Sequence, residues 1–124
     1  MTTTNQTIAE AFSSHRFADA YNHLAPDVEW IAVGEGATIG KSAVIAACEA
    51  ALVAMAEVDT VLTRFVVAAD DDASAIDVIA RYTDQHGTTS VVSSCDVYEF
   101  RDAHVVRITS YAVELPPAES PRTR

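Results

Sequence analysis

The feature that most constrains the fold is the stretch from Thr88 to Leu115, which reads TTSVVSSCDVYEFRDAHVVRITSYAVEL. Residues that favour strands, mostly β-branched and aromatic, fill it on both sides of the polar step Arg101–His104. Two such runs separated by a short polar step predict a β-hairpin. Both faces of the two predicted strands are mixed in polarity, which indicates that both faces are at least partly covered.

Asp96 lies in the first strand of this hairpin, within an otherwise apolar or hydroxylic run. Side chains alternate between the two faces of a strand. Asp96 therefore shares a face with Ser94 and Tyr98. We interpret this face as the wall of a pocket into which Asp96 looks.

An earlier strand is predicted over residues 75–85, followed by a tight turn at positions 86–87, where histidine precedes glycine. If that turn has two residues, Asp77 lies opposite Asp96, with Arg81 on the same face. Directly opposed side chains are roughly 5 Å apart at Cβ, so two carboxylates and a guanidinium converge on one patch of sheet. A slip of one residue would destroy this arrangement.

Length and composition narrow the class of protein. A chain of 124 residues, 49% of them hydrophobic, predicts one domain with a proper core. Lys and Arg number 8 against 18 Asp and Glu, a net charge of −10. The absence of a basic stripe argues against nucleic-acid binding, and no apolar run approaches the ~20 residues that span a bilayer. The start of the chain lacks the features of a signal peptide, so we expect a cytoplasmic protein with two free thiols, Cys48 and Cys95.

The rest of the chain predicts helices and further strands. Helical spacing of apolar residues over 7–14 and 16–24 indicates two short helices or one bent helix. A long helix is expected over 41–57, and its many alanines and valines predict burial over more than one face. Strands are expected over 27–33, with a glycine-loosened loop after it, and over 59–69.

Helices segregated on one face of a largely antiparallel sheet define an α+β domain. We assign residues 1–115 to this domain and residues 116–124, PPAESPRTR, to a disordered tail. The four histidines lie near predicted helix ends or turns, without zinc spacing, and we expect them to face solvent. No metal site, cofactor site, phosphate loop or dinucleotide fingerprint is predicted.

This order of elements resembles the nuclear transport factor 2-like superfamily and, within it, the SnoaL-like proteins. The likeness spans roughly residues 7–115 and is carried by the segments LAPDVEW, IGKSAV and CDVYEFRDAHVVRITSY. The resemblance implies a cone-shaped roll, in which a strongly curved sheet wraps around the helices and leaves a pocket at the wide end. It also implies a homodimer formed through the outer face of the sheet.

Ketosteroid isomerases share this fold, and the comparison is informative residue by residue. Their aspartate that hydrogen-bonds the developing oxyanion begins a D-V-x-x-F pattern, and Asp96 begins the matching run DVYEF. Their proton-shuttling aspartate falls at Ile31 or Ala32, and their first-helix tyrosine falls at about Ile8. Neither replacement can do the job, so the resemblance does not carry steroid isomerisation by that mechanism.

Two other groups with this fold offer chemistry for Asp96. Limonene-epoxide hydrolases use an Asp-Arg-Asp cluster to activate water, and Asp77, Arg81 and Asp96 would form a similar set with different spacing. SnoaL-type cyclases use an acidic residue on these strands for proton transfer. The resemblance also favours the Asp96 face as the concave one, although the pattern alone leaves open the more apolar alternate face of residues 75–85. Pocket walls are then expected at Phe12, Trp30, Ser94, Tyr98 and Tyr111.

The leading hypothesis is a cofactor-free enzyme acting on a small apolar molecule by proton transfer, as an isomerase, a cyclase or an epoxide hydrolase. Asp96 would be the acid or base, and Arg81 and Asp77 would tune it. One alternative is a binding module in which Asp96 is fully paired with Arg81. Another is a dimerisation domain whose pocket is filled by its own side chains.

Overall fold

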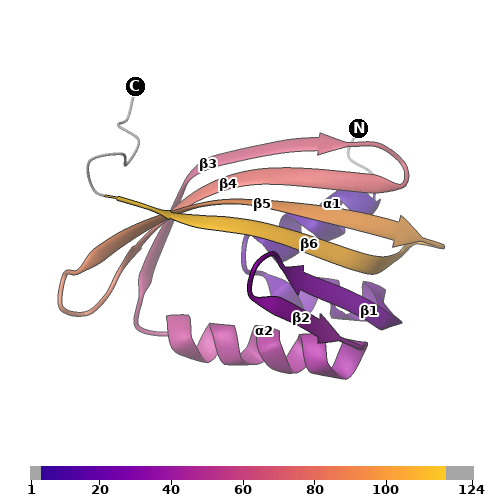
Figure 1. Cartoon of the computed structure of the whole chain (residues 1–124), viewed down its shortest axis with the longest axis horizontal. Helices are drawn as coiled ribbons and strands as arrows, with labels where there is room; N and C mark the ends of the chain where they lie inside the picture. The colour runs from indigo at the N-terminus through magenta and orange to yellow at the C-terminus, as the bar shows by residue number, and fades with distance from the viewer. Residues whose placement is uncertain (1–3, 117–124) are drawn as a thin grey trace.

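The computed structural model describes residues 4–116, so the predicted tail lies outside the described residues apart from Pro116. Two helices precede the first strand, a third follows a short hairpin, and four long strands complete the domain (Figure 1). In chain order the elements are α1 (Thr4–Ser13), the 3-10 helix η1 (Phe17–His23), β1 (Leu24–Ala32), β2 (Gly36–Ile39), α2 (Lys41–Met55), β3 (Asp59–Ala69), β4 (Ala73–Thr83), β5 (Thr89–Arg101) and β6 (His104–Leu115).

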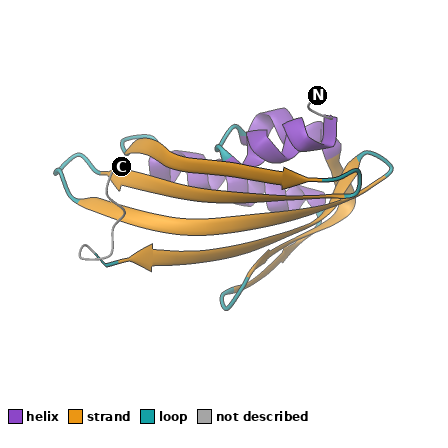
Figure 2. Cartoon of the chain, turned by 90° about the horizontal axis from the view of Figure 1, so that it is seen from above, coloured by secondary structure: helices purple, strands orange, loops and turns teal. Residues whose placement is uncertain are grey.

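The six strands form one curved sheet in the order β2-β1-β6-β5-β4-β3. Neighbouring strands are antiparallel except β1 and β6, which run parallel. The helices lie on one side of the sheet (Figure 2). This arrangement confirms the predicted α+β cone, and it confirms the hairpin of β5 and β6 as its long central pair.

The core lies between the helices and the concave face of the sheet. Ile76 from β4, Tyr98 from β5 and Ile108 from β6 are fully buried there, together with Val28 from β1. The first helix contributes Ile8 and other apolar residues that pack against the same cluster. Burial of an aliphatic side chain of this size contributes about 1.5–3 kcal/mol, so these layers fix the helices onto the sheet.

Two expectations about single elements were wrong. Residues 36–39 form strand β2 in place of a loop, because the chain after Ala32 turns back and pairs antiparallel with β1. Helix α2 buries one stripe only: Val44 and Cys48 are fully buried, while most of its alanines face outward. Its contacts are mainly with β1 and β2, which leaves the outer face uncovered.

The predicted register between β4 and β5 was also wrong, by one residue. The connection has five residues, 84–88, because the Asp84 carboxylate accepts hydrogen bonds from the backbone N–H groups of His86 (2.8 Å) and Thr88 (2.9 Å). Aspartate commonly organises turns in this way. As a result Asp96 faces Ile76, and Asp77 faces Cys95. The more apolar face of β4, which includes Ile76 and Val78, therefore lies on the same side of the sheet as the Asp96 side chain.

Candidate functional site

A cavity of about 250 Å³ lies between the helices and the concave face of β4, β5 and β6. Most of its wall is apolar, and the polar side chains gather on its sheet side and at the end of α1. It is lined by Phe12, Ser13, His15, Phe17, Trp30, Ala51, Met55, Val78, Tyr82, Val92, Ser94, Asp96, Ser110 and Ala112. A mostly apolar cavity with a few convergent polar groups is the usual form of a small-molecule site.

Asp96 reaches this cavity from β5 and is held by a neutral group. The Ser13 hydroxyl at the end of α1 donates a hydrogen bond of 2.8 Å to Asp96 Oδ2. Among residues 4–116, no lysine, arginine or histidine lies within ion-pair distance of this carboxylate. The fully paired arrangement with Arg81, which the binding-module alternative requires, is therefore not present.

Tyr98 lies two residues further along β5, behind the cavity wall, and is fully buried. Its hydroxyl oxygen is 2.5 Å from Ser13 Oγ. Burial, and to a lesser extent the charge of Asp96, raise the pKa of Tyr98 well above its ordinary value, so the phenol keeps its proton. Since Ser13 uses its one hydroxyl proton on Asp96, Tyr98 is the donor to Ser13. The result is a directed chain from Tyr98 through Ser13 to Asp96.

A second polar contact faces Asp96 from the neighbouring strand. Ser110 on β6 is the cross-strand partner of Asp96, and its Oγ accepts a hydrogen bond of 3.0 Å from the indole Nε1 of Trp30. The indole therefore leaves the Ser110 hydroxyl proton available to another acceptor. Ser94, two residues before Asp96, adds a further hydroxyl to the cavity wall.

His15 was missed by the sequence analysis, which placed it in solvent. Its side chain lines the cavity, with ring centroids 5.7 Å from Phe17 and 6.3 Å from Tyr82. Burial lowers the pKa of the imidazole, and the negative charge of Asp96 acts in the opposite direction. The signal in the sequence is weak, because only the backbone turn after α1 decides where this ring points.

The structure separates the predicted site residues into two groups. Phe12, Trp30 and Ser94 lie with Asp96 in the cavity wall, and Tyr98 lies on the same side of the sheet but is buried behind that wall. The others, Asp77, Arg81 and Tyr111, lie on the convex face of the sheet. Asp77 and Arg81 point away from the cavity because the register between β4 and β5 differs by one residue from the predicted one. Tyr111 pairs with Cys95, whose side chain points to the face opposite to that of Asp96.

The contacts on the convex face are those of an ordinary surface. Asp77 accepts a hydrogen bond of 2.7 Å from the Nε of Arg64, and both side chains are about half exposed. The predicted convergence of Asp77, Arg81 and Asp96 is therefore wrong.

Comparison with known proteins decides the family. Residues 6–108 match the SnoaL-like domain. The chain belongs to this family. An NTF2-like protein of unknown function from Cytophaga hutchinsonii ATCC 33406 is 32% identical, with a TM-score of 0.79 over 91% of this chain and 99% of that one. No curated protein matches the sequence.

More distant SnoaL-like and NTF2-like structures share the fold. An epoxide hydrolase from M. tuberculosis, of the LEH-like type, is 18% identical, with a TM-score of 0.66 over 90% of this chain and 84% of that one. A candidate SnoaL-like polyketide cyclase from Mesorhizobium loti is 15% identical, with a TM-score of 0.65 over 87% and 95%. At these identities the likeness concerns the fold alone.

Within residues 4–116, no three His, Cys, Asp or Glu side chains gather in a way that could hold a metal ion. None of the described helices has the length and apolar character needed to cross a bilayer.

Proposed function

We propose that this SnoaL-like protein is a small-molecule enzyme that catalyses proton transfer without a cofactor, with Asp96 as the group that takes and returns the proton. The observation that carries the proposal is the setting of this carboxylate. It lies in the wall of a mostly apolar cavity, with a neutral hydroxyl in place of a cation as its partner. A carboxylate that is not neutralised by a cation is free to act as a base.

The surrounding hydroxyls would position Asp96 for this role. Ser13 holds Oδ2, and the buried Tyr98 phenol holds Ser13, so the carboxylate has a fixed orientation. The other oxygen, Oδ1, would take a proton from a carbon acid or from water. The resulting carboxylic acid would return that proton to the product, so that the enzyme ends each cycle in its starting state.

Cavity size supports a substrate of one or two rings. A cavity of about 150 Å³ holds benzene, whereas the cavity beside Asp96 measures about 250 Å³. A compact cyclic epoxide or unsaturated ketone fits this space better than a tetracyclic molecule. The fold shared with the epoxide hydrolase from M. tuberculosis makes small epoxides the first compounds to test.

The decisive experiment replaces Asp96 by Asn and screens a panel of small cyclic epoxides and β,γ-unsaturated ketones. We expect the wild type to turn over at least one compound and Asp96→Asn to lose at least about 100-fold in kcat, because general acid–base catalysis contributes about 10²–10⁴-fold. The matched control is Asp77→Asn, which makes the same change on the convex face. Its activity should stay within about twofold of wild type.

Two outcomes would contradict the proposal. Near-wild-type turnover by Asp96→Asn would remove Asp96 from the chemistry. Tight binding of panel compounds by both proteins, with no turnover in either, would favour the ligand-binding alternative. The alternative in which the chain's own side chains fill the pocket is disfavoured by the open cavity beside Asp96.

A further inference from the structure

The turn that ends α1 has an unusual residue at its key position. The backbone N–H of Arg16 bonds to the carbonyl of Ala11 (2.8 Å), and that of His15 bonds to the carbonyl of Phe12 (3.1 Å). This pair of bonds defines a Schellman motif, whose residue in the left-handed conformation is usually glycine. Here that residue is His15, with φ of 68°.

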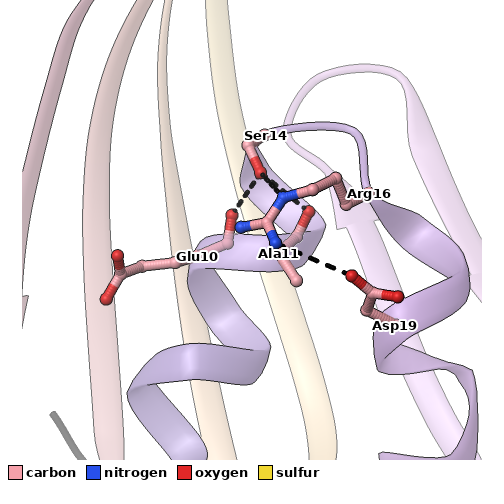
Figure 3. A network of polar contacts seen from close by, with 5 residues as sticks. All are labelled: Glu10, Ala11, Ser14, Arg16 and Asp19. Carbon is pink, nitrogen blue, oxygen red and sulfur yellow. Dashed lines mark hydrogen bonds and ion pairs between the residues drawn. The ribbon is translucent and has the colours of Figure 1, made fainter.

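Neighbouring side chains hold this turn in place. Figure 3 shows the Ser14 hydroxyl donating to the Glu10 carbonyl (2.8 Å) and accepting from Arg16 Nε (3.1 Å). Arg16 also forms an ion pair with Asp19 at 3.6 Å. A non-glycine residue in the left-handed region costs about 1 kcal/mol relative to glycine. The histidine therefore occupies a position where glycine would give the more stable backbone.

The strained backbone has one clear consequence, which is the direction of the imidazole. The ring enters the cavity that contains Asp96 and packs beside Phe17 and Tyr82. The titratable groups that face it are Asp96 from β5 and Tyr82 from β4. Burial lowers the pKa of His15, which favours the neutral ring near pH 7, with one N–H to donate. Strain retained at a site wall is a reason to test for function.

We propose that His15 is a second catalytic residue, whose imidazole N–H donates a hydrogen bond to the substrate oxygen on which negative charge develops while Asp96 exchanges the proton. This proposal rests on the proposed function. For a carbon acid, Asp96 takes the proton from the carbon beside a carbonyl, and the electron pair moves to the carbonyl oxygen as an enolate. His15 stabilises that oxygen without giving up its proton. Asp96 then returns its proton to carbon, so no net charge or proton is lost.

The test imitates this charge distribution with a stable probe. In Asp96→Asn, the neutral amide stands for the carboxyl group after it has taken the proton, and 4-nitrophenolate stands for the enolate. The dissociation constant of 4-nitrophenolate is measured by absorbance titration for three proteins. They are Asp96→Asn alone, Asp96→Asn with His15→Gly, and Asp96→Asn with His15→Asn. Nitrobenzene, measured by calorimetry, is the matched neutral ligand that presents no oxyanion. Urea unfolding of each variant reports its stability.

We expect the added His15→Gly change to weaken 4-nitrophenolate binding by about tenfold or more, because a hydrogen bond to a charged group is lost. Nitrobenzene binding should be unchanged, and the free energy of unfolding should be equal or higher. The asparagine variant should recover part of the affinity, because its amide can donate from the same backbone conformation.

Three results would overturn the role of His15. They are unchanged phenolate affinity in the glycine variant, equal weakening of phenolate and nitrobenzene, or a loss of stability that accompanies the loss of binding. If neither compound binds to the protein with His15 intact, the cavity is not a ligand site, and the proposed function fails together with this role.

Discussion

At the scale of single residues, the site depends on two buried hydroxyls that have little access to water. Tyr98 is fully buried and Ser13 is 5% exposed, so neither can replace a lost partner with solvent. A buried polar group that loses its partner costs about 1–3 kcal/mol, whereas removing both members of a pair can be nearly neutral. The contact between Ser13 and Tyr98 should therefore show strong non-additivity.

A double-mutant cycle tests this pair. We expect Ser13→Ala to lower the free energy of unfolding by about 1–3 kcal/mol, because it removes the Ser13 hydrogen bonds to both the Tyr98 hydroxyl and the Asp96 carboxylate. Tyr98→Phe should cost about 1 kcal/mol. The double variant should cost less than the sum of the two, with a coupling of at least about 0.5 kcal/mol in urea unfolding. Strictly additive losses would show that the two hydroxyls act independently.

The same scale shows what sequence could and could not reveal about the site. Alternation along one strand was sufficient to group Asp96 with Ser94, and both reach the cavity. His15 could not be found this way, because its placement comes from a left-handed backbone at a position where the sequence has no glycine. A helix-ending turn without glycine is visible only once the hydrogen bonds of that turn are known.

At the scale of elements, the last two turns of the β3–β6 meander differ in how much the sequence reveals. The turn between β5 and β6 was predicted correctly from its polar residues, and Arg101 pairs with His104 as in a two-residue hairpin. The β4–β5 connection also contains a glycine, Gly87, but Asp84 captures two backbone N–H groups and lengthens it to five residues. The period of two along a strand predicts which of its residues share a face. The register between β4 and β5 depends instead on the hydrogen bonds that the Asp84 carboxylate makes in the turn.

A substitution in the two-residue turn between β5 and β6 should increase the stability of the protein. Asp102 and Ala103 both have positive φ, 53° and 63°, as type I′ turns require at their two central residues. Alanine is strained there, so Ala103→Gly should raise the free energy of unfolding by about 0.5–1 kcal/mol in urea denaturation. The control Ala68→Gly lies in strand β3 without a positive φ and should lower it. A loss of stability in Ala103→Gly would contradict the assignment of this turn.

At the scale of the whole molecule, the convex face of the sheet exposes several large apolar side chains beside its polar ones. Val66 on β3 is 47% exposed, Tyr111 on β6 is 51% exposed and Val113 is 63% exposed. Val66, Asp77, Cys95 and Tyr111 pair in one row across β3, β4, β5 and β6, and Val113 lies two residues after Tyr111 on the same face of β6. Large apolar side chains gathered on one exposed face are typical of an interface. The convex face is also where the family resemblance implies a dimer.

We expect two copies of the chain to associate through this face, because pairing would remove its exposed apolar side chains from water. Val113→Glu should give a monomer in size-exclusion chromatography with light scattering, because two charges would be buried across the two-fold axis. Val53→Glu is the matched control: Val53 is 78% exposed on α2, away from the sheet, and its variant should stay dimeric.

Cys95 provides an independent test of the same interface, because it lies on the convex face. The other cysteine, Cys48, is fully buried against the core and serves as the internal control. Burial raises the pKa of both thiols, to about 12 for Cys48, so both react more slowly than a fully exposed thiol. If the convex face is covered, iodoacetamide should modify Cys95 several-fold faster in Val113→Glu than in wild type, while Cys48 stays unmodified in both. Equal rates at Cys95, or a wild-type protein that is monomeric at every concentration, would mean that this face is exposed to solvent and that the pocket operates within a single chain.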